Sequence, residues 1–128
     1  PFIADMTALA LSQDFHMAPT MRANYRRRAE IAAQAFAGNN LVRPMLPEGG
    51  MFILLDISAT GLTGLQFAWE LLQQEGVAVM PGGSFGRQAN GFLRISLTVP
   101  DDTLLIAMKR ISDLADRLMA PEGRRATA

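Results

Sequence analysis

The chain has 128 residues, a length typical of one domain, and 49% of them are hydrophobic, as in globular proteins rather than disordered or membrane-spanning ones. Twelve basic and twelve acidic side chains give a formal net charge of zero, so no nucleic-acid or membrane partner is expected. Cysteine is absent and His16 is the single histidine, which excludes disulfides and thiol catalysis and predicts no metal site. A cytoplasmic protein is expected.

The N-terminal third of the chain is predicted to be helical. Residues 3–15 carry apolar side chains at helical spacing. Pro19 should end this helix, because proline disfavours the helical conformation of the residue before it. Thr20 is then placed to cap a second helix over residues 21–37, which the glycine and asparagines of residues 38–40 would end.

The remainder of the chain mixes strands with helices. Residues 51–57 form an apolar run typical of a buried strand, and shorter strands are predicted at 77–80 and 92–97. Thr63 and Gln66 have the spacing of a capping box, which starts a helix that Gly76 ends. Pro100 precedes the last helix, on which Asp113 and Arg117 are spaced for an ion pair.

These elements predict an α/β (α+β) fold, with a small, mixed, three-stranded sheet and helices packed on it. Residues 1–120 form its single domain. The polar residues 121–128 are predicted to be a disordered tail.

The strand at 92–97 contains the most informative charged residue, Arg94. Its alternation places Leu93 and Ile95 on one face and Arg94 on the other. A guanidinium in the middle of a strand is costly to bury unless an anion meets it, and its planar fork suits a carboxylate. An arginine on a wet sheet face, or a structural salt bridge, would give the same spacing.

A glycine-rich loop at residues 81–86 lies just upstream of this strand. Glycine allows tight turns and close approach of the backbone to a ligand. The loop lacks the lysine of a phosphate-binding Walker loop, and it does not open a helix as a dinucleotide-binding loop does. A simple connector is the other interpretation of the loop.

Four strings of residues, in this order and spacing, resemble one known family: Pro47-Glu48-Gly49-Gly50-Met51-Phe52, Asp56-Ile57-Ser58, the segment 76–86, and Gly91-Phe92-Leu93-Arg94-Ile95-Ser96. The family is the class I/II aminotransferases, the fold-type I pyridoxal-phosphate-dependent enzymes related to aspartate aminotransferase. The resemblance covers residues 1 to about 118 and is to the C-terminal small domain. It implies that residues 1–15 are the helix that joins this domain to an absent large domain.

The resemblance also implies roles for individual residues. Arg94 matches the arginine that grips the substrate α-carboxylate through two parallel bonds. Phe85 and Gly86 match the loop that flanks this site, while Phe52 matches an aromatic position with either a core or a site role. The resemblance predicts that Arg94 lies on an open sheet face, with no carboxylate of the chain holding it in a bidentate pair.

The cofactor-binding lysine of the family has no counterpart here. Lys109 is the only lysine, and its neighbours do not resemble the cofactor-binding segment. No catalytic residue is therefore assigned, and the chain alone should bind no pyridoxal phosphate and be inactive. The parent enzyme is expected to be a homodimer that transfers an amino group from an amino acid to a 2-oxo acid.

Two alternatives remain open. One is a standalone α/β module that binds a small carboxylate, and the other is a structural domain whose arginine pairs internally. A parent gene with lysine and aspartate motifs upstream of this segment would distinguish the enzyme fragment from both.

Overall fold

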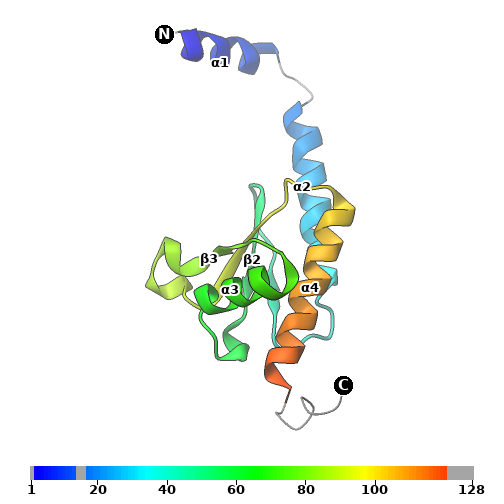
Figure 1. The fold of residues 1–128 in the computed structure, drawn as a ribbon. Coiled ribbons are helices and arrows are strands. Elements are labelled where there is room, and N and C mark those ends of the chain that lie inside the picture. The colour runs from blue at the N-terminus through cyan, green and yellow to red at the C-terminus, as the bar shows by residue number, and fades with distance from the viewer. Residues whose placement is uncertain (1, 14–16, 121–128) are drawn as a thin grey trace.

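The computed structural model describes residues 2–13 and 17–120 and contains one four-stranded sheet with helices (Figure 1). The strand order is β1-β2-β4-β3 and every neighbouring pair is antiparallel. The strands are β1 (Arg43–Met45), β2 (Phe52–Asp56), β3 (Met80–Pro81) and β4 (Phe92–Ser96). The helices are α1 (Phe2–Gln13), α2 (Met17–Gln34), α3 (Gly64–Glu75) and α4 (Asp101–Met119).

The sheet confirms the predicted class but differs in detail from the prediction. It has four strands rather than three, and it is antiparallel rather than mixed. The additional strand, β1, contains Pro44 and lies at the sheet edge, where a residue without an N–H is tolerated. The strand predicted at 77–80 is reduced to Met80 and Pro81, because residues 77–79 do not pair with β4.

The N-terminal helices differ from the prediction at their junction. Pro19 does not end a helix, and Thr20 does not precede one, because α2 begins at Met17 and contains both residues. Proline is tolerated there because the first backbone N–H groups of a helix have no partner within it. The α2 helix ends at Gln34, before the predicted end at residue 37. His16 and the predicted tail at 121–128 lie outside the described residues.

The capping box that starts α3 is confirmed. The Thr63 hydroxyl accepts a hydrogen bond from the Gln66 amide at 3.3 Å, and the Thr63 amide donates to the Gln66 side chain at 3.0 Å. Gly76 ends α3 in the left-handed conformation, with a φ of 64°.

The ion pair predicted within α4 is wrong. Asp113 pairs instead with Lys109, at 2.6 Å, and Arg117 pairs with Glu75 at the end of α3. Sequence spacing identifies only partners on the same helix, whereas α3 and α4 pack against each other and bring Glu75 within reach of Arg117.

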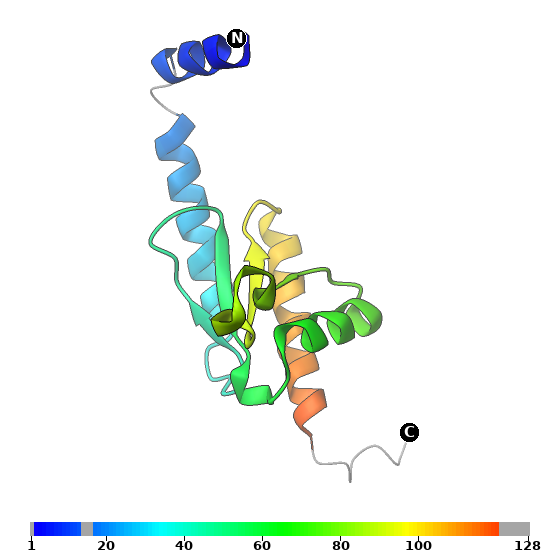
Figure 2. The same cartoon turned by 90° about the vertical axis from the view of Figure 1, so that its left-hand side faces the viewer.

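One face of the sheet forms the hydrophobic core with α2, α3 and α4. Side chains alternate along β2 and β4, so that one set is buried and the other is exposed or half-buried. The buried sheet residues are Ile53, Leu55, Leu93, Ile95 and the following Leu97. They pack against Ala32 of α2, Phe67 and Leu71 of α3, and Leu104, Met108 and Ile111 of α4. Figure 2 shows the sheet with α2 and α4 side by side behind it.

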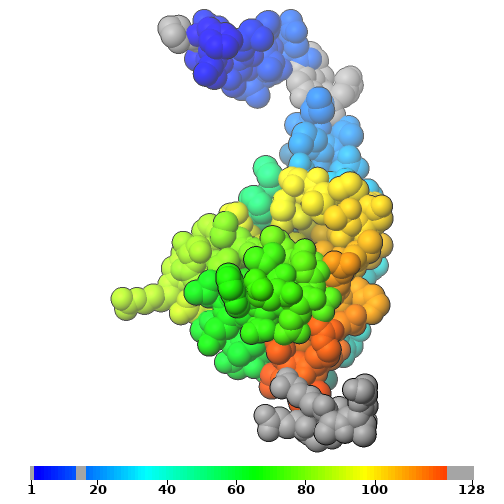
Figure 3. Space-filling model, in the orientation of Figure 1, coloured from blue at the N-terminus to red at the C-terminus, as the bar shows by residue number. Residues whose placement is uncertain are grey.

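Helix α1 buries none of its residues. It lies beyond the N-terminal end of α2, away from the sheet, and forms a separate mass of atoms in the space-filling view (Figure 3). Its exposed side chains include Phe2, Ile3, Met6, Leu9 and Leu11.

Candidate functional site

Arg94 lies at the centre of the sheet face that is turned away from the core. It projects from β4, which has β2 on one side and β3 on the other. Its direct cross-strand neighbours are Leu54 on β2 and Met80 on β3, and its diagonal neighbours on β2 are Phe52 and Asp56. Three of these four neighbours are apolar residues that are 37–44% exposed, and Arg94 itself is half-buried.

The guanidinium of Arg94 lies over two aromatic rings. Its Cζ atom is 4.1 Å from the centroid of the Phe52 ring and 4.5 Å from that of Phe85. Each ring attracts the cation through the negative potential of its face without using an N–H donor. Within residues 2–13 and 17–120, no carboxylate forms an ion pair with Arg94.

The acidic residue beside Arg94 on this face, Asp56, is bound elsewhere. It accepts a hydrogen bond from Arg43 Nη2 at 2.8 Å and one from the Ser58 amide at 3.0 Å. Burial of Asp56 opposes its ionisation, but the hydrogen bonds from Ser58 and Arg43 outweigh burial and hold its pKa below the usual value. Asp56 is thus a carboxylate whose partners are already in place.

The glycine-rich loop brings Phe85 to this site. A short 3-10 helix, η2 (Gly82–Phe85), follows β3, and its backbone lies against the segment that leads into β4. A Cβ atom on Gly82 would lie 2.3 Å from the Ala89 carbonyl oxygen, so only glycine fits there. Gly86 follows η2 with a φ of 134°, a region that favours glycine. The loop is therefore a compact support for Phe85.

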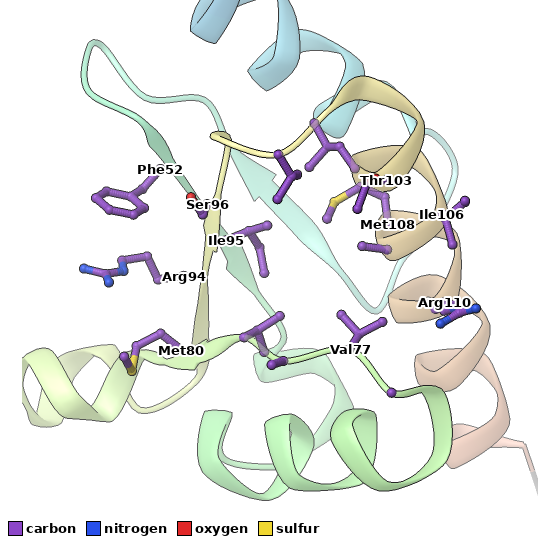
Figure 4. Close-up of a pocket in the computed structure, with 16 residues that line it drawn as sticks. Phe52, Val77, Met80, Arg94, Ile95, Ser96, Thr103, Ile106, Met108 and Arg110 are labelled. Atoms are coloured by element: carbon purple, nitrogen blue, oxygen red, sulfur yellow. The ribbon is translucent and has the colours of Figure 1, made fainter.

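A groove of about 570 Å³ lies next to the arginine, between β4, residues 76–80 and α4. It exists because residues 77–79 diverge from β4. Figure 4 shows Phe52 and Arg94 on one side of β4, and Val77 and Met108 on the side of the helix. Arg94 and Phe52 also line the groove, so the arginine site lies at its edge, with the guanidinium pointing away from α4.

The described residues do not fit a lysine-bound cofactor. Lys109, the only lysine of the chain, lies on α4 in its pair with Asp113, and α4 packs on the sheet face opposite to Arg94. Within the same residues, no group of three acidic or histidine side chains is placed to hold a metal ion. None of the described helices is both long and apolar enough to span a bilayer.

Arg94, Phe85 and Phe52, which the sequence singled out separately, lie together, and Gly86 adjoins them. Whether they bind substrate stays a prediction. Arg43 was not predicted, because its pairing with Asp56 depends on the register of the unpredicted β1.

A family model and a relative of known sequence both relate this chain to aminotransferases. Residues 3–111 match the family described as aminotransferase class I and II. The chain is 37% identical over 118 residues to arginine–pyruvate transaminase AruH of Pseudomonas aeruginosa, covering 92% of this chain and 30% of that protein.

Two solved structures are similar in fold. One is an aromatic aminotransferase from Pyrococcus horikoshii, with a TM-score of 0.69, 29% identity, and coverage of 74% of this chain and 25% of that one. The other is a pyridoxal-phosphate-bound putative aminotransferase from Clostridium difficile, with a TM-score of 0.64, 30% identity, and coverage of 70% and 23%. The chain thus spans less than a third of the length of each relative.

Proposed function

Because the chain belongs to the class I and II aminotransferase family, the fold-type I enzymes related to aspartate aminotransferase, we propose that it is the C-terminal small domain of such an enzyme and binds the substrate α-carboxylate through Arg94. The parent enzyme would transfer an amino group from an amino acid to a 2-oxo acid. The coverage of less than a third of each relative supports a fragment. We propose that residues 1–15 join it to the large domain.

The main support for the proposal is that, among the described residues, aromatic rings rather than a carboxylate contact the Arg94 guanidinium. A half-buried guanidinium ordinarily has an anionic partner, because its charge is costly to remove from water. Here aromatic faces contact it, and the adjacent carboxylate of Asp56 is bound to Arg43. The N–H edge of Arg94 can thus donate two parallel hydrogen bonds to an incoming carboxylate.

The surroundings of Arg94 favour such an ion pair. The neighbouring side chains of Leu54, Met80 and Phe85 offer no competing hydrogen-bond partner for a carboxylate. If the large domain covers this face, water is excluded. The ion pair between Arg94 and the substrate carboxylate then strengthens, because the local dielectric constant falls. Arg94 therefore binds and orients the substrate and takes no part in proton transfer.

Pyridoxal phosphate would supply the electron-withdrawing group that activates the amino acid in the parent enzyme. The residues that hold it would lie in the large domain, because this chain has no lysine in a suitable place. We accordingly propose that the isolated chain is inactive, and that the parent is a cytoplasmic homodimer.

The test uses the full-length enzyme. Arg94→Ala should lower kcat/KM for amino acids and 2-oxo acids alike, roughly 30-fold or more. This corresponds to a loss of about 2–5 kcal/mol of binding free energy in the transition state. Arg94→Lys should restore little, since a point charge cannot reproduce the planar fork. Arg87→Ala, which removes an exposed arginine from the same loop region, is the matched control. Unchanged turnover of Arg94→Ala would refute the assignment.

A standalone carboxylate-binding module is the second candidate. The sheet and three helices enclose one hydrophobic core without help from another chain, which favours a unit that folds alone. The coding sequence upstream of this segment distinguishes the two candidates. An upstream segment with the cofactor lysine supports the enzyme fragment, and the lack of such a segment supports the module.

A further inference from the structure

We propose that Arg43, Phe52 and Phe85 are positioning residues that keep the Arg94 guanidinium open for a ligand carboxylate. Arg43 does so by holding the competing acid, Asp56, and the two phenylalanines do so by holding the cation. The inference rests on the proposed function only for the identity of the ligand, because the geometry itself can be measured without one.

Asp56 is within reach of Arg94 in the register of the sheet. Asp56 lies opposite Phe92, and Arg94 lies opposite Leu54, so the two charged residues are diagonal neighbours on one face. Such neighbours are about 7–8 Å apart at the backbone, a gap that a long arginine side chain can span. Attraction between opposite charges would therefore close the site internally if nothing else held Asp56.

Arg43 provides the alternative partner. It lies directly opposite Asp56 in the pairing of β1 with β2, and its Nη2 atom donates to Oδ2 at 2.8 Å. The Arg43 side chain is 76% exposed, whereas that of Asp56 is 16% exposed. An exposed ion pair of this kind contributes little to stability. Together with the Ser58 amide, which donates to Oδ1 at 3.0 Å, it fixes the direction in which the Asp56 carboxylate points.

The phenylalanines act on the cation itself. Phe52 reaches Arg94 as its other diagonal neighbour on β2, and Phe85 reaches it from η2. Ring faces attract a guanidinium without accepting its in-plane N–H bonds. The side chain is therefore fixed in place while its donors remain available, which reduces the entropy lost when a carboxylate binds.

The first measurement is the NMR signal of the Arg94 side-chain Nε–Hε group in the full chain without ligand. Phe52→Leu and Phe85→Leu should move this signal toward the value of an unstructured arginine, because the ring currents are lost. Phe52→Tyr and Phe85→Tyr should keep the signal near its position in the unsubstituted chain, because the ring remains. Phe2→Leu on α1 should leave the signal unchanged. Phe85 is 56% exposed, so its variant tests the proposal even if Phe52→Leu unfolds the chain.

The second measurement concerns Arg43. Arg43→Gln should move the Arg94 signal without ligand, as Asp56 binds to Arg94, and should weaken pyruvate binding about two- to fivefold. Adding Asp56→Asn to this variant should reverse both effects. Arg26→Gln, which breaks the exposed pair with Glu30 on α2, is the matched control and should have neither effect.

The outcomes separate this inference from the proposed function. An Arg94 signal that none of the Arg43, Phe52 and Phe85 variants moves would overturn the inference. If the variants move the signal as expected but pyruvate never perturbs it, the positioning stands and carboxylate binding fails.

Discussion

Arg28 on α2 donates a hydrogen bond from Nε to Oδ1 of Asp101, the first residue of α4, at 2.9 Å. The same guanidinium donates from Nη1 to the carbonyl oxygen of Leu97, just after β4, at 2.9 Å. Arg27 adds a second contact to Asp101, with Nη2 and Oδ1 3.2 Å apart. The two arginines thereby join α2 to the start of α4 and to the end of the strand that carries Arg94.

We expect this junction to make stability depend on pH. The hydrogen bonds from Arg27 and Arg28 hold the pKa of Asp101 below its usual value. A lowered folded-state pKa stabilises the fold fully above the unfolded value, about 3.9, and this contribution is lost as pH falls through the folded pKa. Urea unfolding of Asp101→Asn should show reduced stability at pH 7 and a smaller decline below pH 4. Asp113→Asn on the same helix is the control, and equal pH profiles for the two variants would contradict the prediction.

The addition of a single methyl group at Gly82 should destabilise the fold. A Cβ there would approach the carbonyl oxygens of Ala89 and Phe92 to 2.3 and 2.8 Å. Backbone must therefore move, and Gly82→Ala should lower the free energy of unfolding by about 1–3 kcal/mol. Gly49→Ala is the matched control, because nothing lies within 4 Å of its added methyl group and its φ is not in the left-handed region. Chemical denaturation of both variants decides the point, and equal stabilities would show that the loop is loosely packed.

Helix α1 should make the isolated chain self-associate. Phe2 and Leu11 are 72% and 77% exposed, and contiguous apolar surface of this kind marks an interface. Sedimentation velocity should show a size that increases with concentration. Replacing Ile3 and Met6 with glutamate should reduce this increase, whereas a chain that stays monomeric at every concentration would contradict the prediction.

Pyridoxal phosphate should not bind covalently to the isolated chain. Lys109 is already paired with Asp113 on the exposed surface of α4, where its side chain is 75% exposed. Absorbance spectra of the chain mixed with cofactor should show no stoichiometric band of a lysine-bound form. A band that disappears in Lys109→Ala would refute this.

Local patterns in the sequence predicted the features that depend on local physics. The capping box at Thr63 and the stop at Gly76 are determined by backbone groups a few residues away, and both are present. The prediction that Pro19 ends a helix was wrong, because proline is tolerated in the first turn of a helix, where Pro19 lies. The contact of Phe85 with Arg94 depends on how a loop folds back. That outcome is set by tertiary packing, which one sequence does not display.

The location of Arg94 within the sheet limits how the site can adapt. β4 is hydrogen-bonded on both sides, to β2 and to β3, and its inner face belongs to the core. The backbone of Arg94 therefore cannot shift toward a ligand as a flexible loop would, without breaking strand pairing. Adjustment to a smaller or larger ligand therefore falls to the Arg94 side chain, whose guanidinium lies over the faces of Phe52 and Phe85.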